Sequence, residues 1–128
     1  MFRQFILVVT ILIVGTVTAG RASNADCTLK NLPNLQYGST SCRLNDDAKA
    51  HLAKIAQMYR DSAKSGASCK IVIIGHPVAG DESQEKVTCR LGVIQRHLMN
   101  TEGLDPQSLI TESNGTAKDE NLFEFKAR

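Results

Sequence analysis

Four side chains that could contact a ligand lie close together in the middle of the chain. His76, Asp81, Ser83 and Arg90 all fall within the stretch Lys70–Arg90, KIVIIGHPVAGDESQEKVTCR. The apolar run at its start predicts a buried strand, the glycine and proline after it predict a turn, and the amphipathic remainder predicts a helix. An arginine near the start of a helix opposes the helix dipole and asks for an anionic partner. The stretch therefore predicts a ligand-facing corner of a domain built from helices and strands.

These residues do not form a recognisable catalytic set. Ser39, Ser41 and Thr88 make no Ser/His/Asp arrangement, so the sequence offers no activated nucleophile. His76 is interpreted as a strand-end residue hydrogen-bonded to the backbone, and a catalytic base is the alternative. The four cysteines lack the close C-x-x-C spacing of zinc and redox sites. We therefore expect a protein that is not an enzyme and that uses no metal and no cofactor.

Two helices and four strands are expected to position this corner. Asn45 predicts the cap of the first helix, and Gly66 is suited to close it. The second helix is predicted from Asp81 to Gly103, with Gln84 placed to complete a capping box. Strands are predicted at Leu35–Tyr37, Cys69–Gly75, Leu109–Glu112 and Leu122–Lys126. The order β-α-β-α-β-β predicts an α/β fold of the α+β type, a two-layer sandwich with both helices on one face of a small mixed sheet.

Length and composition indicate one small domain with an aliphatic core. The chain has 128 residues, of which 42% are hydrophobic, and it contains no tryptophan. Its net charge of +2 comes without a basic cluster in the sequence, and aromatic residues do not alternate with the lysines and arginines. Nucleic acid is therefore not an expected partner.

The N-terminus has the pattern of an export signal. Arg3 precedes an apolar segment, and small residues follow it. We predict a signal peptide over residues 1–25, cleaved within Ala19–Ala25, and a single domain over residues 26–128. The alternative is an uncleaved segment that contacts the membrane, because Phe5–Ala19 is near the lower length limit for a spanning helix. An even number of cysteines in a small exported domain predicts two disulfides.

The order and spacing of several motifs resemble the OmpA-like, peptidoglycan-associated domain family, of which the chain would be a divergent member. Ile71–His76, IVIIGH, is similar to the family's apolar strand that ends in G-H-T-D. Arg90 is followed by apolar residues at the spacing of the family's second helix, and Gly103–Pro106 resembles the exit from that helix. The resemblance covers Leu35–Phe125. It implies the family's fold and a location in the periplasm or cell envelope of a Gram-negative bacterium.

The resemblance also implies a ligand, although the site departs from the family's pattern. In the family, an aspartate after the strand and the helix arginine clamp the diaminopimelate residue of the peptidoglycan stem peptide. Arg90 matches that arginine, but Val78 occupies the acidic position. Ser83 stands where the family has an asparagine, and Lys86 and Val87 replace the leucine and serine before the arginine. The site is therefore expected to be degenerate.

Two residues of the site keep two interpretations each. Asp81 either caps the second helix or swings in as a substitute for the missing acid. Arg90 either binds a ligand or is a surface cation near Glu82 or Glu85. The sequence does not decide between them.

Chain order predicts how the cysteines pair. In parallel β-α units, the carboxyl ends of the strands and the N-termini of the helices lie at one edge of the sheet. Cys42 and Cys89 belong at that edge, whereas Cys27 and Cys69 precede strands at the opposite edge. We predict the disulfides Cys42–Cys89 and Cys27–Cys69, the first of which would lie across the family's binding groove.

Two functions are compatible with these features. The first is a structural or docking module that contacts other envelope proteins, as a component of an envelope-spanning secretion or motility complex, and has a degenerate peptidoglycan site. The second is a working non-covalent peptidoglycan anchor, in which Arg90 holds diaminopimelate with help from Asp81, His76 and Ser83.

Overall fold

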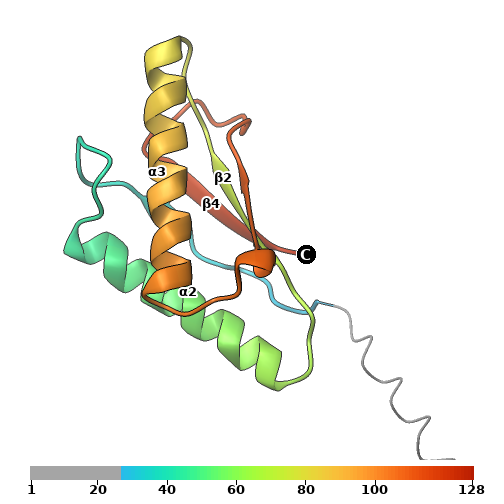
Figure 1. The fold of residues 1–128 in the computed structure, drawn as a ribbon. Coiled ribbons are helices and arrows are strands. Elements are labelled where there is room, and N and C mark those ends of the chain that lie inside the picture. Colours follow the sequence, from blue (N-terminus) through green and yellow to red (C-terminus); the bar gives the residue numbers. More distant parts are fainter. Residues whose placement is uncertain (1–26) are drawn as a thin grey trace, which may run out of the picture.

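The computed structural model describes residues 27–128, so the predicted signal peptide and its cleavage site lie outside the described residues. The elements, in chain order, are β1 (Leu35–Gln36), α2 (Asp46–Lys64), β2 (Ile71–Gly75), α3 (Asp81–Asn100), the 3₁₀ turn η3 (Pro106–Ser108), β3 (Leu109–Glu112) and β4 (Leu122–Ala127) (Figure 1). The predicted β-α-β-α-β-β order is confirmed. Within residues 27–128, no helix is both long enough and apolar enough to cross a membrane.

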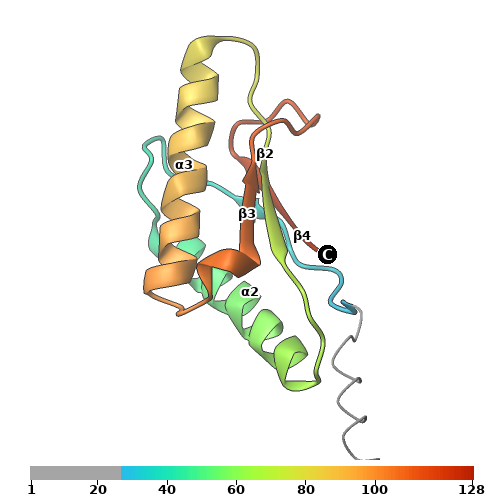
Figure 2. The same ribbon diagram turned by 45° about the vertical axis from the view of Figure 1, so that its right-hand side comes forward.

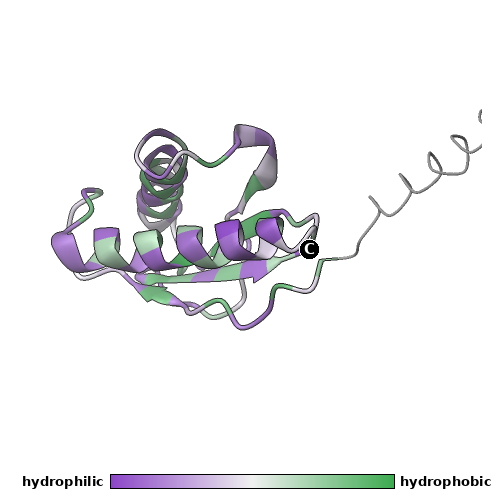
Figure 3. Ribbon diagram, turned by 90° about the horizontal axis from the view of Figure 1, so that it is seen from below, coloured by the Kyte–Doolittle hydropathy of each residue, from purple (hydrophilic) through white to green (hydrophobic). Residues whose placement is uncertain are grey.

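The four strands form one mixed sheet in the order β1-β4-β2-β3. β2 and β3 are parallel, whereas β4 is antiparallel to both of its neighbours, β1 and β2. β1, β2 and β3 therefore run in the same direction, and β4 runs against them. Both helices pack on one face of this sheet. Figure 3 shows the two layers from below, and Figure 2 shows α3 beside β2 and β3. The predicted two-layer α+β architecture is thus confirmed.

The sequence signals at the ends of α2 act as predicted. The Asn45 side chain accepts a hydrogen bond from the backbone N–H of Ala48 at 2.8 Å, and Asp46 and Asp47 follow in the first turn. At the other end, Gly66 has a φ of 90°, a left-handed conformation that glycine adopts without strain. Both ends of α2 are therefore set by local chemistry.

The start of α3 differs from the prediction. Gly80, with a φ of 111°, is the N-cap and has no side chain to bond, so Asp81 is the first helical residue and the predicted capping box does not form. The Gln84 side chain donates instead to Ser113 Oγ at 3.1 Å. The physical reason is that glycine tolerates the positive φ at which the chain enters the helix, and this places Asp81 one residue inside it.

The core lies between the helices and the inner face of the sheet. β2 and α3 approach closely at Gly75, because a Cβ added there would overlap Val87 Cγ1 and lie 3.3 Å from Phe123 Cε2. The residues with no exposed surface include Leu52, Ile55, Ile71, Ile73, Val87, Ile94, Leu98 and Phe123. This aliphatic contact holds α3 firmly on the sheet, and α3 carries the side chains of the predicted site.

Two disulfides add covalent links at opposite edges of the sheet. Cys27 is bonded to Cys69, with their Cα atoms 4.9 Å apart, and Cys42 is bonded to Cys89, with their Cα atoms 6.0 Å apart. This is the pairing predicted from chain order. The bonds join residues 42 and 47 positions apart, so each is expected to stabilise the fold by about 4 kcal/mol through loop closure. Cys42–Cys89 ties the loop between β1 and α2 to the middle of α3.

Candidate functional site

Arg90 lies in the middle of α3 and is almost completely buried. It is the tenth of the 20 residues of the helix, so it is not near the helix start as predicted. The N-terminal part of the helix dipole does not reach it, because that effect fades within the first turn. Only 1% of its surface is exposed, and it is the largest fully buried side chain in the described part of the chain. A buried guanidinium must find its partners inside the protein.

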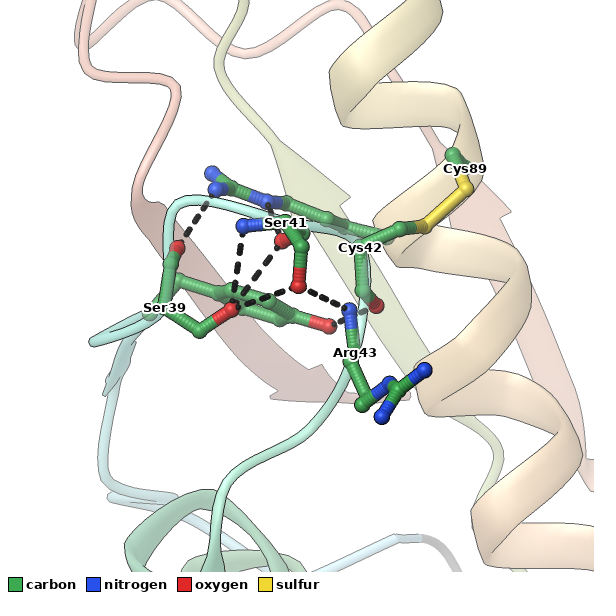
Figure 4. The surroundings of a disulfide bond; sticks show 7 residues. Ser39, Ser41, Cys42, Arg43 and Cys89 are labelled. Carbon is green, nitrogen blue, oxygen red and sulfur yellow. Dashed lines mark hydrogen bonds between the residues drawn. A yellow bond between two sulfur atoms is a disulfide. The ribbon is translucent and has the colours of Figure 1, made fainter.

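Part of the Arg90 guanidinium is bound by the loop between β1 and α2. Its Nε donates to the carbonyl oxygen of Ser41 at 3.2 Å, and its Nη2 donates to that of Ser39 at 2.8 Å. Figure 4 shows this loop lying against α3 beside the disulfide. The arginine therefore holds the loop to the helix by hydrogen bonds.

The rest of the guanidinium binds the segment that leads into β4. Nη1 donates to the carbonyl oxygen of Glu120 at 3.0 Å and to the side-chain oxygen of Asn121 at 2.8 Å. An arginine has five N–H donors, and these two bonds bring the number used by the protein's own groups to four. Arg90 thus joins α3 to two loops that are far apart in the sequence.

Tyr37 closes one face of the guanidinium. The Arg90 Cζ atom lies 4.4 Å from the centre of the Tyr37 ring, within cation–π range, and the ring is also packed 5.4 Å from that of Phe123. The Tyr37 hydroxyl donates to the carbonyl oxygen of Cys42 at 2.7 Å. Burial raises the pKa of this tyrosine, and the neighbouring charge of Arg90 opposes that rise. The phenol therefore stays protonated and donates to the same loop that Arg90 holds.

This arrangement corrects the sequence interpretation of Arg90. The alternative of a surface cation near Glu82 or Glu85 is wrong, because the side chain is buried and its hydrogen bonds go elsewhere. Its acceptors are three backbone carbonyls and one side-chain amide. Arg90 acts as an internal tether in this structure, and a ligand carboxylate would have to displace some of these acceptors.

Glu120 is a member of this region that the sequence analysis missed. Its carboxylate accepts from Ser83 Oγ at 2.8 Å and from Lys86 Nζ at 2.8 Å. Ser83 also accepts from the backbone N–H of Val78 at 2.9 Å, so it fixes the chain at the start of α3. Glu120 lies 37 positions from Ser83 in the sequence, and no motif connects the two. Only the folded chain brings this acid to the helix.

The hydrogen bonds from Lys86 and Ser83, in that order, lower the pKa of Glu120. The charges of Lys86 and Arg90 lower it further, and partial desolvation opposes them. Both carboxylate oxygens of this acid are already engaged by the protein's own donors. Like the donors of Arg90, the acceptor atoms of Glu120 are therefore occupied by the protein's own groups.

Asp81 is not brought to Arg90. It is exposed at the first position of α3, and nine residues of helix separate the two by about 13 Å along the helix axis. Neither role predicted for Asp81, the cap or the substitute acid, is seen. Val78, at the position expected to be acidic, is 39% exposed.

His76 follows β2 and has a structural environment. It is 2% exposed, and its Nδ1 accepts a hydrogen bond from the backbone N–H of Ala117 at 3.0 Å, as predicted for a strand-end residue. Nε2 lies 2.8 Å from a carboxylate oxygen of Glu124, but the atoms are not aligned for a hydrogen bond. Gly115 lies directly against the ring, since a Cβ there would overlap it. His76 therefore supports the loop between β3 and β4.

The described residues assemble no set of groups suited to metal binding. Within residues 27–128, no group of three or more His, Cys, Asp or Glu side chains is placed to hold a metal ion. Of the four predicted ligand-binding residues, Arg90 and Ser83 meet through Glu120, whereas Asp81 stands apart and His76 supports a different loop. The hydrogen bonds of Arg90, Ser83 and His76 therefore hold parts of the protein's own fold together.

Replacing Arg90 should strongly destabilise the fold. Arg90→Ala removes a donor from three partly buried carbonyls, two of which have no other donor within residues 27–128, and empties the space of a fully buried side chain, so we expect the free energy of unfolding to fall by about 3–5 kcal/mol. Arg90→Lys keeps the charge but loses the planar guanidinium, so its free energy of unfolding should lie between those of Arg90→Ala and the parent. Urea denaturation measures both. The control is Arg96→Ala, at an exposed position of the same helix, whose free energy of unfolding should stay within about 0.5 kcal/mol of the parent's. An equal loss of stability in Arg90→Ala and Arg96→Ala would contradict the role of Arg90 as a tether.

Glu120 should make stability depend on acid pH. The ordinary pKa of a glutamate, 4.5, applies in the unfolded chain, and the folded value is lower. The contribution of Glu120 is therefore complete above that pH and is lost as the pH falls through the folded-state pKa. In Glu120→Gln, thermal unfolding should show a smaller decline between about pH 5 and pH 3. Glu82→Gln, on the exposed side of α3, is the control. Parallel stability curves for the parent and Glu120→Gln would refute the assignment.

Comparison with known proteins identifies the fold. No protein-family model and no curated protein matches the chain. Among solved structures, it is similar to the OmpA-like domain of FopA1 from Francisella tularensis subsp. tularensis SCHU S4, with a TM-score of 0.56 and 17% sequence identity. The match covers 74% of this chain and 69% of that chain. Together with the two helices on a mixed sheet of order β1-β4-β2-β3, this similarity shows that the chain has the OmpA-like fold.

Proposed function

We propose that this protein is a structural or docking module of the bacterial cell envelope whose peptidoglycan site is degenerate. It would reside in the periplasm, act by binding and not by catalysis, and serve an envelope-spanning assembly such as a secretion or motility complex. The OmpA-like fold supports an envelope-associated role. The observation that carries the proposal is the internal use of the Arg90 guanidinium.

The hydrogen bonds of Arg90 argue against capture of a stem peptide. A carboxylate binds an arginine best through two parallel N–H bonds. The acceptors of Ser39, Ser41, Glu120 and Asn121 take four of the five donors, and the side chain is 1% exposed. A ligand would have to move two loops, and one of them is also held by the Cys42–Cys89 bond. The cost of that movement would weaken binding.

Within residues 27–128, the site also lacks a carboxylate that could bind the ammonium group of the ligand beside Arg90. A zwitterionic group needs an anion close to the cation, and Val78 stands where the family's acid is expected. Asp81 is about 13 Å along the helix from Arg90, which is too far for both to hold one amino-acid group. Glu120 is closer, but both of its oxygens accept hydrogen bonds from Ser83 and Lys86.

The disulfides support an oxidising compartment. Cys27–Cys69 and Cys42–Cys89 account for all four cysteines of the chain, and such bonds persist in exported proteins. This agrees with the export signal predicted over residues 1–25. The periplasm supplies both the oxidising conditions and the neighbouring envelope proteins that a docking module requires.

Sedimentation with purified peptidoglycan sacculi tests the proposal. The protein should remain in the supernatant, in the same proportion as without sacculi, whereas an OmpA-like domain known to bind sacculi should pellet. Arg90→Lys, once shown to be folded, should behave like the parent.

The competing function, a peptidoglycan anchor that uses Arg90, predicts the opposite pattern. The parent would pellet with sacculi, free diaminopimelate would release it, and Arg90→Lys would lose the binding while remaining folded. That set of results would overturn the proposed function.

A further inference from the structure

A groove of about 590 Å³ lies between the start of α2 and the C-terminal half of α3. It is separate from the buried Arg90, which does not line it, and begins at the Cys42–Cys89 disulfide. This volume is within the range of small ligand-binding sites. The lining residues are Cys42, Arg43, Leu44, Lys49, Cys89, Val93, Arg96, His97, Asn100 and Thr101.

Three cations line this groove, and none of them has a partner within the described residues. Arg43, Lys49 and Arg96 are exposed, and no side-chain hydrogen bond or ion pair to them is formed within residues 27–128. Their positions in the sequence are scattered, so no basic cluster was visible there. The fold therefore assembles a positive patch on a chain whose net charge is only +2.

The groove has no acidic residue in its lining. Glu102 lies 3.9 Å from His97 Nε2 and also 3.6 Å from Arg60, which is outside the groove. Asp46 and Asp47, in the first turn of α2 near Lys49, form no ion pair with the three cations. Within residues 27–128, no ion pair therefore neutralises the three cations. Such a patch attracts anionic groups and accelerates their association.

Apolar groups line the groove together with the cations. They are Val93, the Cys42–Cys89 disulfide and the buried side chain of Leu44. Figure 4 shows Arg43 extending from the loop toward α3, below the disulfide. A complementary partner would combine carboxylates with at least one apolar side chain.

The shape of the surface favours a polypeptide over a lipid membrane. Insertion into a membrane interface needs protruding apolar side chains, and Val78 is the one large apolar residue that is exposed in the described part of the chain. It lies before α3 and does not line the groove. A groove lined by three exposed cations and by apolar groups fits an extended chain better than a flat membrane.

We propose that this groove is a docking site for an acidic segment of a partner protein, with Arg43, Lys49 and Arg96 binding its carboxylates and Val93 and the disulfide receiving an aliphatic side chain. This inference rests on the proposed docking function and names the surface that performs it. It adds an interaction that is independent of peptidoglycan and of Arg90.

Fluorescence anisotropy with a labelled peptide of alternating glutamate and leucine tests the site. The peptide should bind saturably, more weakly as salt is added, and the same peptide with glutamine in place of glutamate should bind at least about tenfold more weakly. The double variant Arg43→Glu with Arg96→Glu should weaken binding of the acidic peptide by about tenfold or more. Lys54→Glu with Lys64→Glu, two exposed lysines of α2 outside the groove, makes the same change in net charge and should have little effect.

Several results would overturn this inference. Equal weakening by the two double variants would mean that net charge alone attracts the peptide. Absence of saturable binding would exclude the acidic segment. Binding to phosphatidylglycerol vesicles that depends on Arg43 and Arg96, without binding of the peptide, would assign the groove to a lipid. If the peptide does not bind and the protein also does not sediment with sacculi, the docking function would belong to another surface. If the protein sediments with sacculi through Arg90, the docking function itself would be rejected.

Discussion

The buried guanidinium of Arg90 is the constraint on which this region of the fold depends. A charge that is 1% exposed persists only when the surrounding chain satisfies its donors, and here four acceptors from two separate loops do so. The loop before α2 and the segment before β4 must therefore keep their backbone conformations for the charge to stay buried. Tyr37 covers one face of the guanidinium and donates a hydrogen bond to the first loop. One side chain of α3 thereby organises the chain around the carboxyl end of β1.

The Cys42–Cys89 disulfide and the hydrogen bonds of Arg90 restrain the same loop, the one between β1 and α2. Cys89 precedes Arg90 in the sequence, and its disulfide fixes Cys42, which is one residue from Ser41 and accepts from Tyr37. This loop is therefore held to α3 twice. The groove between α2 and α3 begins at the same disulfide, because Cys42 and Cys89 are among its lining residues. The tied loop thus forms part of the wall of the groove.

The sequence predicted what depends on local chemistry and on periodicity. The cap of α2 at Asn45, the apolar run of β2, the β-α-β-α-β-β order of the elements and the disulfides all follow from nearby residues or from chain order. The errors concern Asp81 and Arg90. Asp81 was displaced by the conformational freedom of Gly80, and the burial of Arg90 depends on loops about 30 and 50 residues away, as the hydrogen bonds to Glu120 and Ser39 show. Glu120 could not be found at all, because its role exists only where the last loop meets α3.

The central claim is that the protein itself occupies the donors of Arg90, and NMR of the arginine side chains tests it most directly. In a ¹⁵N-labelled sample, the Nε–H of Arg90 should give a sharp signal that exchanges slowly with water, because it is buried and bonded to Ser41. Exposed Arg43 and Arg96 should exchange rapidly under the same conditions. Addition of diaminopimelate should leave the Arg90 signal unchanged. Rapid exchange at Arg90, with a saturable shift on addition of diaminopimelate, would contradict the account.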